Sequence, residues 1–87
     1  IIHPNVAAFL KERGVKLLGV DIPSVDELTS KDVLTHHALH EAGIYIIEGL
    51  VLEEIDEGYY DFIGLPLKIE GADGAPVRAV IRKINKI

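Results

Sequence analysis

The sequence contains no cysteine, and this absence removes several kinds of chemistry at once. Disulfide bonds, zinc–thiolate sites and thiol nucleophiles all need a cysteine sulfur, so none of them is available to these residues. A chain without cysteine also suits a reducing compartment. Histidine and carboxylate side chains are then the groups that remain for binding a metal ion or moving protons.

Basic residues are scarce beside acidic ones, and the formal net charge is -5. Nucleic-acid binding needs clustered Lys and Arg to neutralise phosphates, so this balance argues against a nucleic-acid partner. No apolar run approaches the ~20 residues that a membrane-spanning helix needs. The two isoleucines at the start are too short for the apolar region of a signal peptide. The sequence therefore predicts a soluble, cytoplasmic protein without a membrane partner.

Methionine is absent as well, and the first residue is Ile1. Because a translated chain normally begins with methionine, we expect these residues to be a processed or truncated piece of a longer chain. The 87 residues suffice for one small domain at most, and a hydrophobic content of 48% allows it a small core.

The first half of the chain alternates helical and extended patterns, separated by glycines. Apolar positions at helical spacing follow Asn5, a helix-capping residue, and Gly14 suits a left-handed stop. Short apolar runs read as strands that are buried on both faces. The expected elements are a helix from Asn5 to residue 13, a strand over 15–21, a loop over 21–26, a helix capped by Thr29 or Ser30 and ending at Ala42, and a strand over 44–47. This rhythm favours an α/β fold with parallel strands.

The second half reads as a hairpin. An acidic stretch over 50–58 predicts a helical turn and a loop, and residues 59–69 predict a strand with a bulge or bend at Gly64 and Pro66. Residues 70–76 are predicted to be a turn, with Asp73-Gly74 as its signal, and a last strand is expected over 77–84.

The side chains best suited to bind a metal ion or move protons lie between residues 35 and 49, where three of the four histidines precede an apolar run and Glu48. From His36 to Gly43 a helix rises roughly 10 Å, and from Ile44 to Glu48 a strand returns about 13 Å. If the two pack antiparallel, His36 and Glu48 lie level at the carboxyl end of the strand. The 21–26 loop, beginning with Asp21, follows the other parallel strand at that end, where α/β sheets bind ligands.

The pattern leaves alternatives open. A neutral imidazole with a carboxylate is a partial ligand set for zinc or manganese, and His36 with His40 is a second chelating pair at helical spacing. An equally favoured interpretation is that these histidines are surface residues of an amphipathic helix. For His37 and His40 taken singly the surface interpretation is favoured, and His3 is expected to be a solvated terminal residue.

Several stretches spread over the chain together resemble the C-terminal part of bacterial kynurenine formamidases (arylformamidases), which are metal-dependent cyclase-like hydrolases. No one motif is decisive, but their order and spacing cover nearly all 87 residues. The stretches are GVDIPSVD (19–26), SKD (30–32), HHAL (36–39), Gly43-Ile44, EGL (48–50) and LPLKIEGADGAPVRA (65–79).

The resemblance implies a swivelling β/β/α domain with a mixed sheet, of which residues 1–87 are the C-terminal segment. It implies a homodimer or a higher homo-oligomer. It also implies two divalent metals per subunit, usually zinc, with manganese or another divalent metal as the alternative.

In that family the metal ligands come from an N-terminal H-x-G-T-H-x-D motif together with one later histidine and one later glutamate. The matching positions are His36 and Glu48, which sets His40 aside as a ligand. The N-terminal motif is absent from these residues, and with it the histidine implied as general acid/base, so no catalytic residue is expected here. Four residues remain as candidates to support the ligands: Asp21, Ser24, Asp26 and His37.

The activity that the resemblance implies is the hydrolysis of N-formyl-L-kynurenine to L-kynurenine and formate in tryptophan breakdown. These residues alone are expected to be inactive, because the partner that completes the site is the missing N-terminal part of the same domain. Two alternatives remain: a related hydrolase acting on another, cyclic amide, and a non-catalytic assembly module if the chain is complete as it stands.

Overall fold

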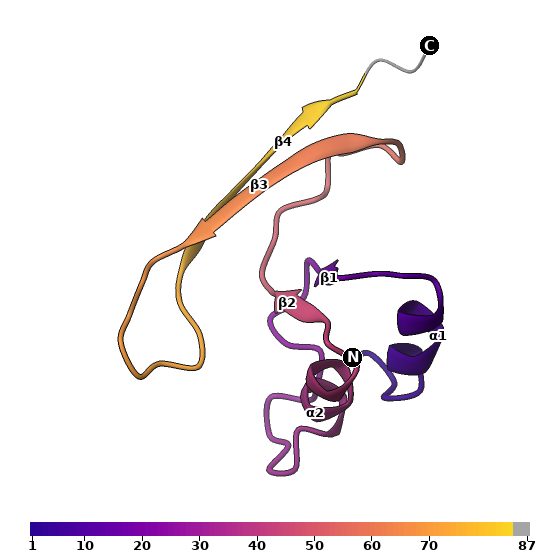
Figure 1. Cartoon of the computed structure of the whole chain (residues 1–87), viewed down its shortest axis with the longest axis vertical. Helices are drawn as coiled ribbons and strands as arrows, with labels where there is room; N and C mark the ends of the chain where they lie inside the picture. Colours follow the sequence, from indigo (N-terminus) through magenta and orange to yellow (C-terminus); the bar gives the residue numbers. More distant parts are fainter. Residues whose placement is uncertain (85–87) are drawn as a thin grey trace. The chain divides into compact units, whose positions relative to one another are not determined.

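The computed structural model describes residues 1–84 and divides into two compact units. Unit 1 covers Ile1–Glu53 and unit 2 covers Glu54–Ile87. The predicted segment ran to residue 87, so its last three residues lie outside the described part. Each unit contains one small sheet (Figure 1).

Unit 1 alternates helices and strands as predicted. Its strands pair in parallel, with Leu18 opposite Ile46, and α1 and α2 pack beside each other close to this strand pair (Figure 1). The parallel pairing confirms the α/β interpretation. The elements are α1 (Val6–Glu12), β1 (Leu17–Gly19), α2 (Leu34–Glu41) and β2 (Tyr45–Ile47).

Glycines end both helices, as the sequence predicted. Gly14 and Gly43 have φ values of +77° and +75°, a left-handed conformation that costs glycine little. Asn5 stands at the N-cap of α1, although its side chain makes no capping hydrogen bond there.

The core of unit 1 is small and draws on the loop as well as on the helices. Its buried side chains are Ala7, Val25, Leu39 and Ile44. Val25 lies in the predicted 21–26 loop, and its carbonyl accepts the Ile2 N–H at 2.8 Å. The loop is therefore packed into the body of the unit, and this fixes its neighbours in place.

The strands are shorter and less buried than predicted. Leu17 and Tyr45 face each other across the pair and are 37% and 77% exposed. Within the described residues this sheet has only two strands, and α2 packs against β2. Side chains alternate between the two faces of a strand, so Leu17 and Tyr45 point to the face that no other element covers. The expectation that the strands are buried on both faces was therefore wrong.

Helix α2 begins later than predicted, and neither Thr29 nor Ser30 caps it. The N-cap is Val33, with φ 42° and ψ 53°, and the Ser30 hydroxyl accepts the Val33 N–H at 3.1 Å. The first-turn N–H groups of Thr35 and His36 are instead bound by the carboxylate of Asp26. The Asp26 side chain, eight residues before the start of α2, therefore caps the first turn of this helix.

Val33 offers a direct test of this helix start. A left-handed conformation costs a non-glycine residue about 1–2 kcal/mol, whereas asparagine tolerates it. We expect Val33→Asn to stabilise the chain by about 0.5–1 kcal/mol in urea unfolding, after some loss of apolar burial. The matched control is Val51→Asn, at a side chain that is 86% exposed. Equal effects of the two substitutions would contradict the expectation.

Unit 2 is an antiparallel hairpin of β3 (Tyr60–Pro66) and β4 (Val77–Lys83) (Figure 1). Its register runs unbroken from Tyr60 opposite Lys83 to Pro66 opposite Val77, so the predicted bulge was wrong. A Cβ on Gly64 would come within 2.6 Å of the Phe62 ring, so the glycine serves this close approach. Pro66 occupies the last position of the ladder, where its missing N–H costs little.

The turn predicted over residues 70–76 is confirmed, and it bends most tightly at Gly71, with φ +76°, ahead of Asp73-Gly74. The helical turn predicted in the acidic stretch was wrong. Residues 50–58 form turns and bends without a helix. Within residues 1–84 the strands make two separate sheets, one parallel and one antiparallel, and the expected mixed sheet is not formed by these residues.

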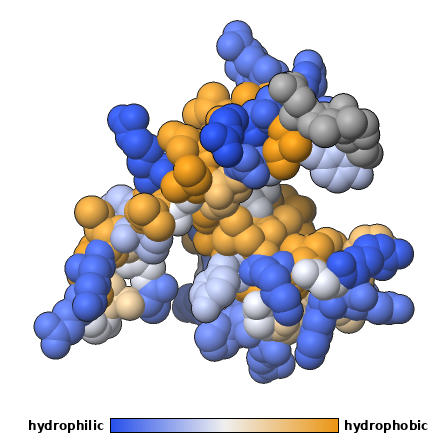
Figure 2. Space-filling model, turned by 45° about the horizontal axis from the view of Figure 1, so that its top comes forward, coloured by the Kyte–Doolittle hydropathy of each residue, from blue (hydrophilic) through white to orange (hydrophobic). Residues whose placement is uncertain are grey.

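The hairpin exposes apolar side chains of the kind that are usually buried in a hydrophobic core. Phe62 and Ile81 pair on one face and are 41% and 40% exposed, and no described residue of unit 2 is buried. In the space-filling view, hydrophobic residues lie beside hydrophilic ones on the surface of the chain (Figure 2). A two-stranded hairpin by itself is only marginally stable.

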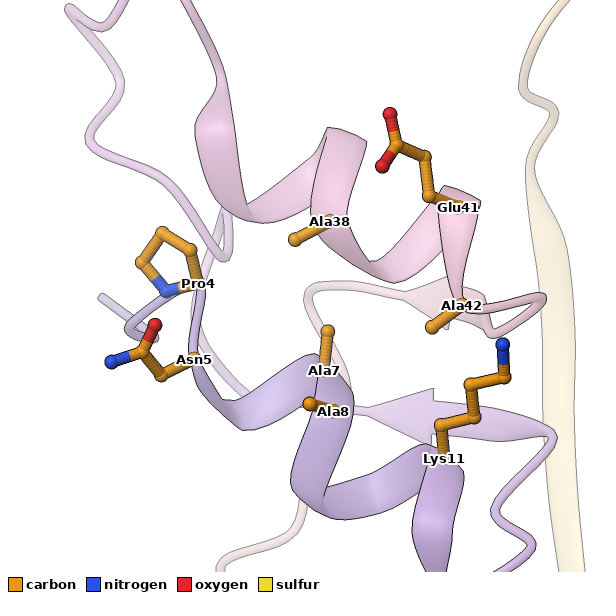
Figure 3. Close-up of a pocket in the computed structure, with 8 residues that line it drawn as sticks. All are labelled: Pro4, Asn5, Ala7, Ala8, Lys11, Ala38, Glu41 and Ala42. Carbon is orange, nitrogen blue, oxygen red and sulfur yellow. The ribbon is translucent and has the colours of Figure 1, made fainter.

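A groove between α1 and α2 is lined by four alanines together with Pro4, Asn5, Lys11 and Glu41 (Figure 3). Ala38 of α2 and Ala42, which directly follows this helix, lie on one side of it, and Ala7 and Ala8 of α1 lie on the other (Figure 3). It contains none of the histidines. In residues 1–84, no helix has the length and apolar character required to cross a membrane.

Candidate metal-ligand site

His36 and Glu48 meet, as the helix-and-returning-strand geometry predicted. The Nε2 atom of His36 lies 2.8 Å from Oε2 of Glu48. His36 sits in the first turn of α2, and Glu48 directly follows β2. The chain after β1 runs alongside, because Val20 N–H donates to Ile47 O and Gly49 N–H donates to Ile22 O. The contact therefore forms at the carboxyl end of the parallel strands.

Asp26 holds the other side of the imidazole. Its Oδ2 lies 2.7 Å from Nδ1 of His36 and accepts the backbone N–H of the same residue at 2.9 Å. Its Oδ1 accepts the backbone N–H of Thr35 at 2.9 Å. One carboxylate thus binds both the start of the helix and the ring that the helix carries.

The environment of Asp26 favours its ionised form. Burial alone raises the pKa of this carboxyl, but the hydrogen bonds from the His36 and Thr35 backbone, with those from their side chains, outweigh it and lower the pKa from 3.8 to about 2. A carboxylate at a helix N-terminus is also on the favoured side of the dipole. Asp26 is therefore a fixed negative charge next to the ring.

Glu48 is held by the same loop. Its Oε2 accepts the Val25 N–H at 2.9 Å, so the oxygen that faces His36 is also fixed from the backbone. The His36 and Glu48 side chains are 33% and 28% exposed, which leaves the contact open to a ligand on one side. Neighbouring residues of one loop thus anchor both members of the pair.

The other candidates are placed differently. Ser24 accepts the Asp26 N–H at 3.1 Å and so shapes the loop without touching the pair. Asp21, His37 and His40 are exposed, and in residues 1–84 no hydrogen bond or ion pair joins any of them to His36 or Glu48. His3 is exposed, as expected, and its Nδ1 accepts the Asn5 N–H at 3.1 Å. Of the four supporting candidates, Asp26 is the one that forms a hydrogen bond or ion pair with a member of the pair in the described part of the chain.

Sequence reasoning missed the part played by Val25 and Thr35. Val25 acts through its backbone N–H, which no side-chain pattern reveals. The Thr35 hydroxyl donates to the Ile2 carbonyl and the residue is 1% exposed, so it ties the helix start to the chain start. An available signal was the apolar Val25 between Ser24 and Asp26, because an apolar residue in a polar loop often packs inward.

The donor set fits part of a metal site. Nδ1 faces Asp26, which leaves Nε2 beside a carboxylate oxygen, and imidazole with carboxylate suits zinc or manganese. Within residues 1–84 no group of three or more histidine and carboxylate side chains is arranged to hold a metal. Two ligands leave a metal ion under-coordinated, so the described residues supply a fraction of a centre.

Comparison with known proteins identifies close relatives, although no protein-family model matches the chain. A kynurenine formamidase of Geobacillus thermodenitrificans is 53% identical over 84 residues, which are 97% of this chain and 40% of that protein. Kynurenine formamidases of Bacillus cereus and Bacillus mycoides are each 51% identical over 83 residues. The chain spans 40% of the length of these relatives.

Solved structures agree in fold. A protein described as a potential metal-dependent hydrolase with cyclase activity matches 93% of this chain with a TM-score of 0.81 and 32% identity, and 40% of its own length is covered. A protein described as a predicted metal-dependent hydrolase from Bacillus stearothermophilus matches with a TM-score of 0.80. The resemblance inferred from the sequence is confirmed: over nearly all of its length the chain is similar to kynurenine formamidases, and it spans two fifths of their length.

Proposed function

We propose that these residues form part of a metal-dependent amide hydrolase that converts N-formyl-L-kynurenine to L-kynurenine and formate. The observation that carries the proposal is the contact between His36 Nε2 and Glu48 Oε2, with each side chain anchored from the 24–26 loop. Identity of about half to kynurenine formamidases supports the substrate. The tryptophan-catabolic role and a cytoplasmic location belong to the same proposal.

In this proposal His36 and Glu48 are ligands and do not attack the substrate. His36 offers the Nε2 lone pair, and Glu48 offers Oε2 as a fixed negative oxygen next to it. A bound zinc ion would lower the pKa of a water molecule to near neutrality and polarise the formyl oxygen. Because both side chains are anchored, little conformational freedom remains to be lost when they bind.

The remaining parts of the site belong, in this proposal, to a longer polypeptide. The two units are segments of one cyclase-like domain, and the general acid/base and the other ligands of a two-zinc centre lie in residues beyond these. The assembled protein is a homodimer or a higher homo-oligomer. These residues alone are inactive, since two ligands do not complete a metal centre.

The test is metal content of the natural polypeptide that contains these residues. Replacing His36 with alanine is expected to reduce bound zinc at least about tenfold in elemental analysis, because the chain loses one of its two donors. The control is His40→Ala, which removes an exposed histidine from the same helix and should leave zinc unchanged. Equal zinc in the two variants would overturn the proposal.

A different substrate is the second candidate, and one observation favours it. One structurally similar protein is described as having cyclase activity, so a cyclic amide is a reasonable alternative to the formyl amide. A panel of formamides and cyclic amides separates the two. The formamidase proposal requires faster turnover of N-formyl-L-kynurenine than of every cyclic amide tested.

A non-catalytic assembly module is the third candidate. It is favoured by the absence, within residues 1–84, of a third metal ligand beside the pair. Zinc titration of the natural polypeptide decides between the two classes. Binding that is no tighter than that of the His36→Ala variant would support the assembly module.

A further inference from the structure

We propose that the start of α2 is a two-state switch that depends on the backbone conformation of Val33. In the short form, which the structure shows, α2 begins at Leu34 and the Asp26 carboxylate binds its first turn. In the long form, residues 31–33 are added to the helix and Asp26 is released. The inference goes beyond the proposed function, because it concerns the backbone of the helix and needs no bound metal ion.

Val33 is strained in the short form. Its φ of 42° and ψ of 53° lie in the left-handed region, and no other described residue except glycine has a positive φ. A branched side chain fits this region poorly, whereas glycine adopts it easily. Strained residues of this kind persist where the surrounding structure holds them, and they cluster at switch regions and ligand sites. A change of Val33 to the right-handed region would relieve the strain and allow the helix to begin earlier.

The cap of the long form is already in place. The Ser30 hydroxyl accepts the Val33 N–H at 3.1 Å. If Ser30 is the N-cap of a helix that begins at Lys31, Val33 is the third helical residue, and its N–H is one of the two that a serine N-cap binds. Asp32 then lies in the first turn, on the favoured side of the helix dipole. The long form therefore needs a helical backbone at residues 31–33 but no new cap.

The two forms exclude each other, because they place different acceptors on the same two N–H groups. In the short form the Thr35 and His36 N–H groups each donate to Asp26 at 2.9 Å. In a helix that begins at Lys31, hydrogen bonds between residues four apart would bring these N–H groups to the carbonyls of Lys31 and Asp32. Asp26 then loses the backbone contacts that fix it against the His36 ring. The ring is therefore anchored on this side only in the short form.

The segment that rearranges is not packed into unit 1. Residues 27–32 are exposed apart from Ser30, which is half-buried, and the Leu28 side chain is 79% exposed. The backbone hydrogen bond from the Ser30 N–H to the Glu27 carbonyl, at 2.9 Å, lies within the segment itself. The side chains of the hydrophobic core all come from outside it. The change from one form to the other therefore costs little apolar burial.

Opposing contributions set the balance between the forms. The short form gains hydrogen bonds to a carboxylate that is 9% exposed, and such charge-assisted bonds are about twice as strong as neutral ones. The long form gains three helical residues and loses the strain at Val33. We expect the long form as a minor population of about 1–10%, the range usual for a competing conformer of a folded protein. A ligand that binds the His36 ring where Asp26 holds it would select the short form.

The first experiment removes the Asp26 carboxylate from the natural polypeptide that contains these residues. Loss of an ordinary cap destabilises the start of a helix. In Asp26→Ala we expect the reverse: the helix lengthens, and the carbon-13 chemical shifts of Lys31, Asp32 and Val33 move to helical values in NMR spectra recorded without metal. Shifts that stay non-helical at these three residues would overturn the inference.

A second substitution, added to Asp26→Ala, tests whether Val33 is the switch residue. Glycine adopts the left-handed region freely and disfavours a helix interior. Val33→Gly should therefore return the shifts of Lys31 and Asp32 at least about halfway to their wild-type values. Val51→Gly is the matched control, at a side chain that is 86% exposed, and should leave them helical. Equal shifts in the two double variants would mean that the change does not depend on Val33, contrary to the inference.

The wild-type polypeptide decides if Asp26→Ala does not fold. Exchange with a minor form on the microsecond-to-millisecond timescale is measured by NMR relaxation dispersion. We expect dispersion at Lys31, Asp32 and Val33, with shift differences toward helical values, and its loss in Val33→Gly. Flat profiles at these residues in wild type would overturn the inference. Because the spectra are recorded without metal, a polypeptide that failed to bind zinc would contradict the proposed function and leave this inference unaffected.

Discussion

Replacing Glu48 with glutamine is expected to weaken zinc binding by the natural polypeptide by at least about 100-fold, which exceeds the usual loss from an outer supporting residue. The amide is neutral and is a poor ligand for a hard divalent cation, so the substitution removes one of the two donors that the described residues bring together. The fold should survive, because the amide oxygen can still accept the Val25 N–H that Glu48 binds at 2.9 Å. Calorimetric titration with zinc measures the affinity.

The control for this variant is Glu53→Gln, which makes the same change of charge at an exposed position of the same unit. It should bind zinc as the wild type does, since exposed charges at a distance are screened by salt. Equal losses in the two variants would mean that net charge, and not ligation, governs the affinity. No loss in either would remove Glu48 from the proposed centre.

Leu39→Ala is expected to destabilise unit 1 by about 2–5 kcal/mol, the usual cost of truncating a fully buried leucine. Leu39 is 0% exposed and belongs to a core whose other buried side chains are Ala7, Val25 and Ile44. A unit of this size has a total stability of only about 3–8 kcal/mol. One substitution therefore removes a large share of it. Denaturant unfolding followed by circular dichroism gives the free energy of unfolding.

Leu34→Ala is the matched control, in the same helix but at a side chain that is 61% exposed. It should change the free energy of unfolding by less than about 0.5 kcal/mol, as surface substitutions usually do. Because Leu39 belongs to the helix that carries His36 and shares a core with Ile44 and Ile46, which lead to Glu48, the buried variant should also lower zinc affinity. If Leu39→Ala left both the free energy of unfolding and the zinc affinity unchanged, packing of this core would not be what aligns His36 with Glu48.

Much of unit 1 could be predicted from local pattern. The helix stops at Gly14 and Gly43 follow from the ease with which glycine adopts positive φ, and these were confirmed. The parallel pairing of β1 with β2 follows from the helix that connects them. The convergence of His36 and Glu48 follows from the lengths of one helix and one returning strand, which are set by backbone geometry.

Features that depend on distant partners could not be predicted in this way. The start of α2 was misplaced because Ser30 is a good local cap, whereas the first turn is bound by Asp26, nine and ten residues before the two amides that it accepts. The bulge at Gly64 was wrong because pairing with β4 continues unbroken through Gly64 opposite Ala79. Strand burial was overestimated, since an apolar run carries no information on how many strands flank it.

For this protein, then, the sequence by itself determined the residue types, their order and the level at which His36 and Glu48 would meet. Those properties depend on neighbours in the chain and on fixed helix and strand rises. Only the tertiary structure decided how the pair is held, with the Val25 N–H on Glu48 and the buried Asp26 on Nδ1 of His36. The physical reason is that a hydrogen bond across a loop depends on where packing places both partners, and here the burial of Val25 sets that position.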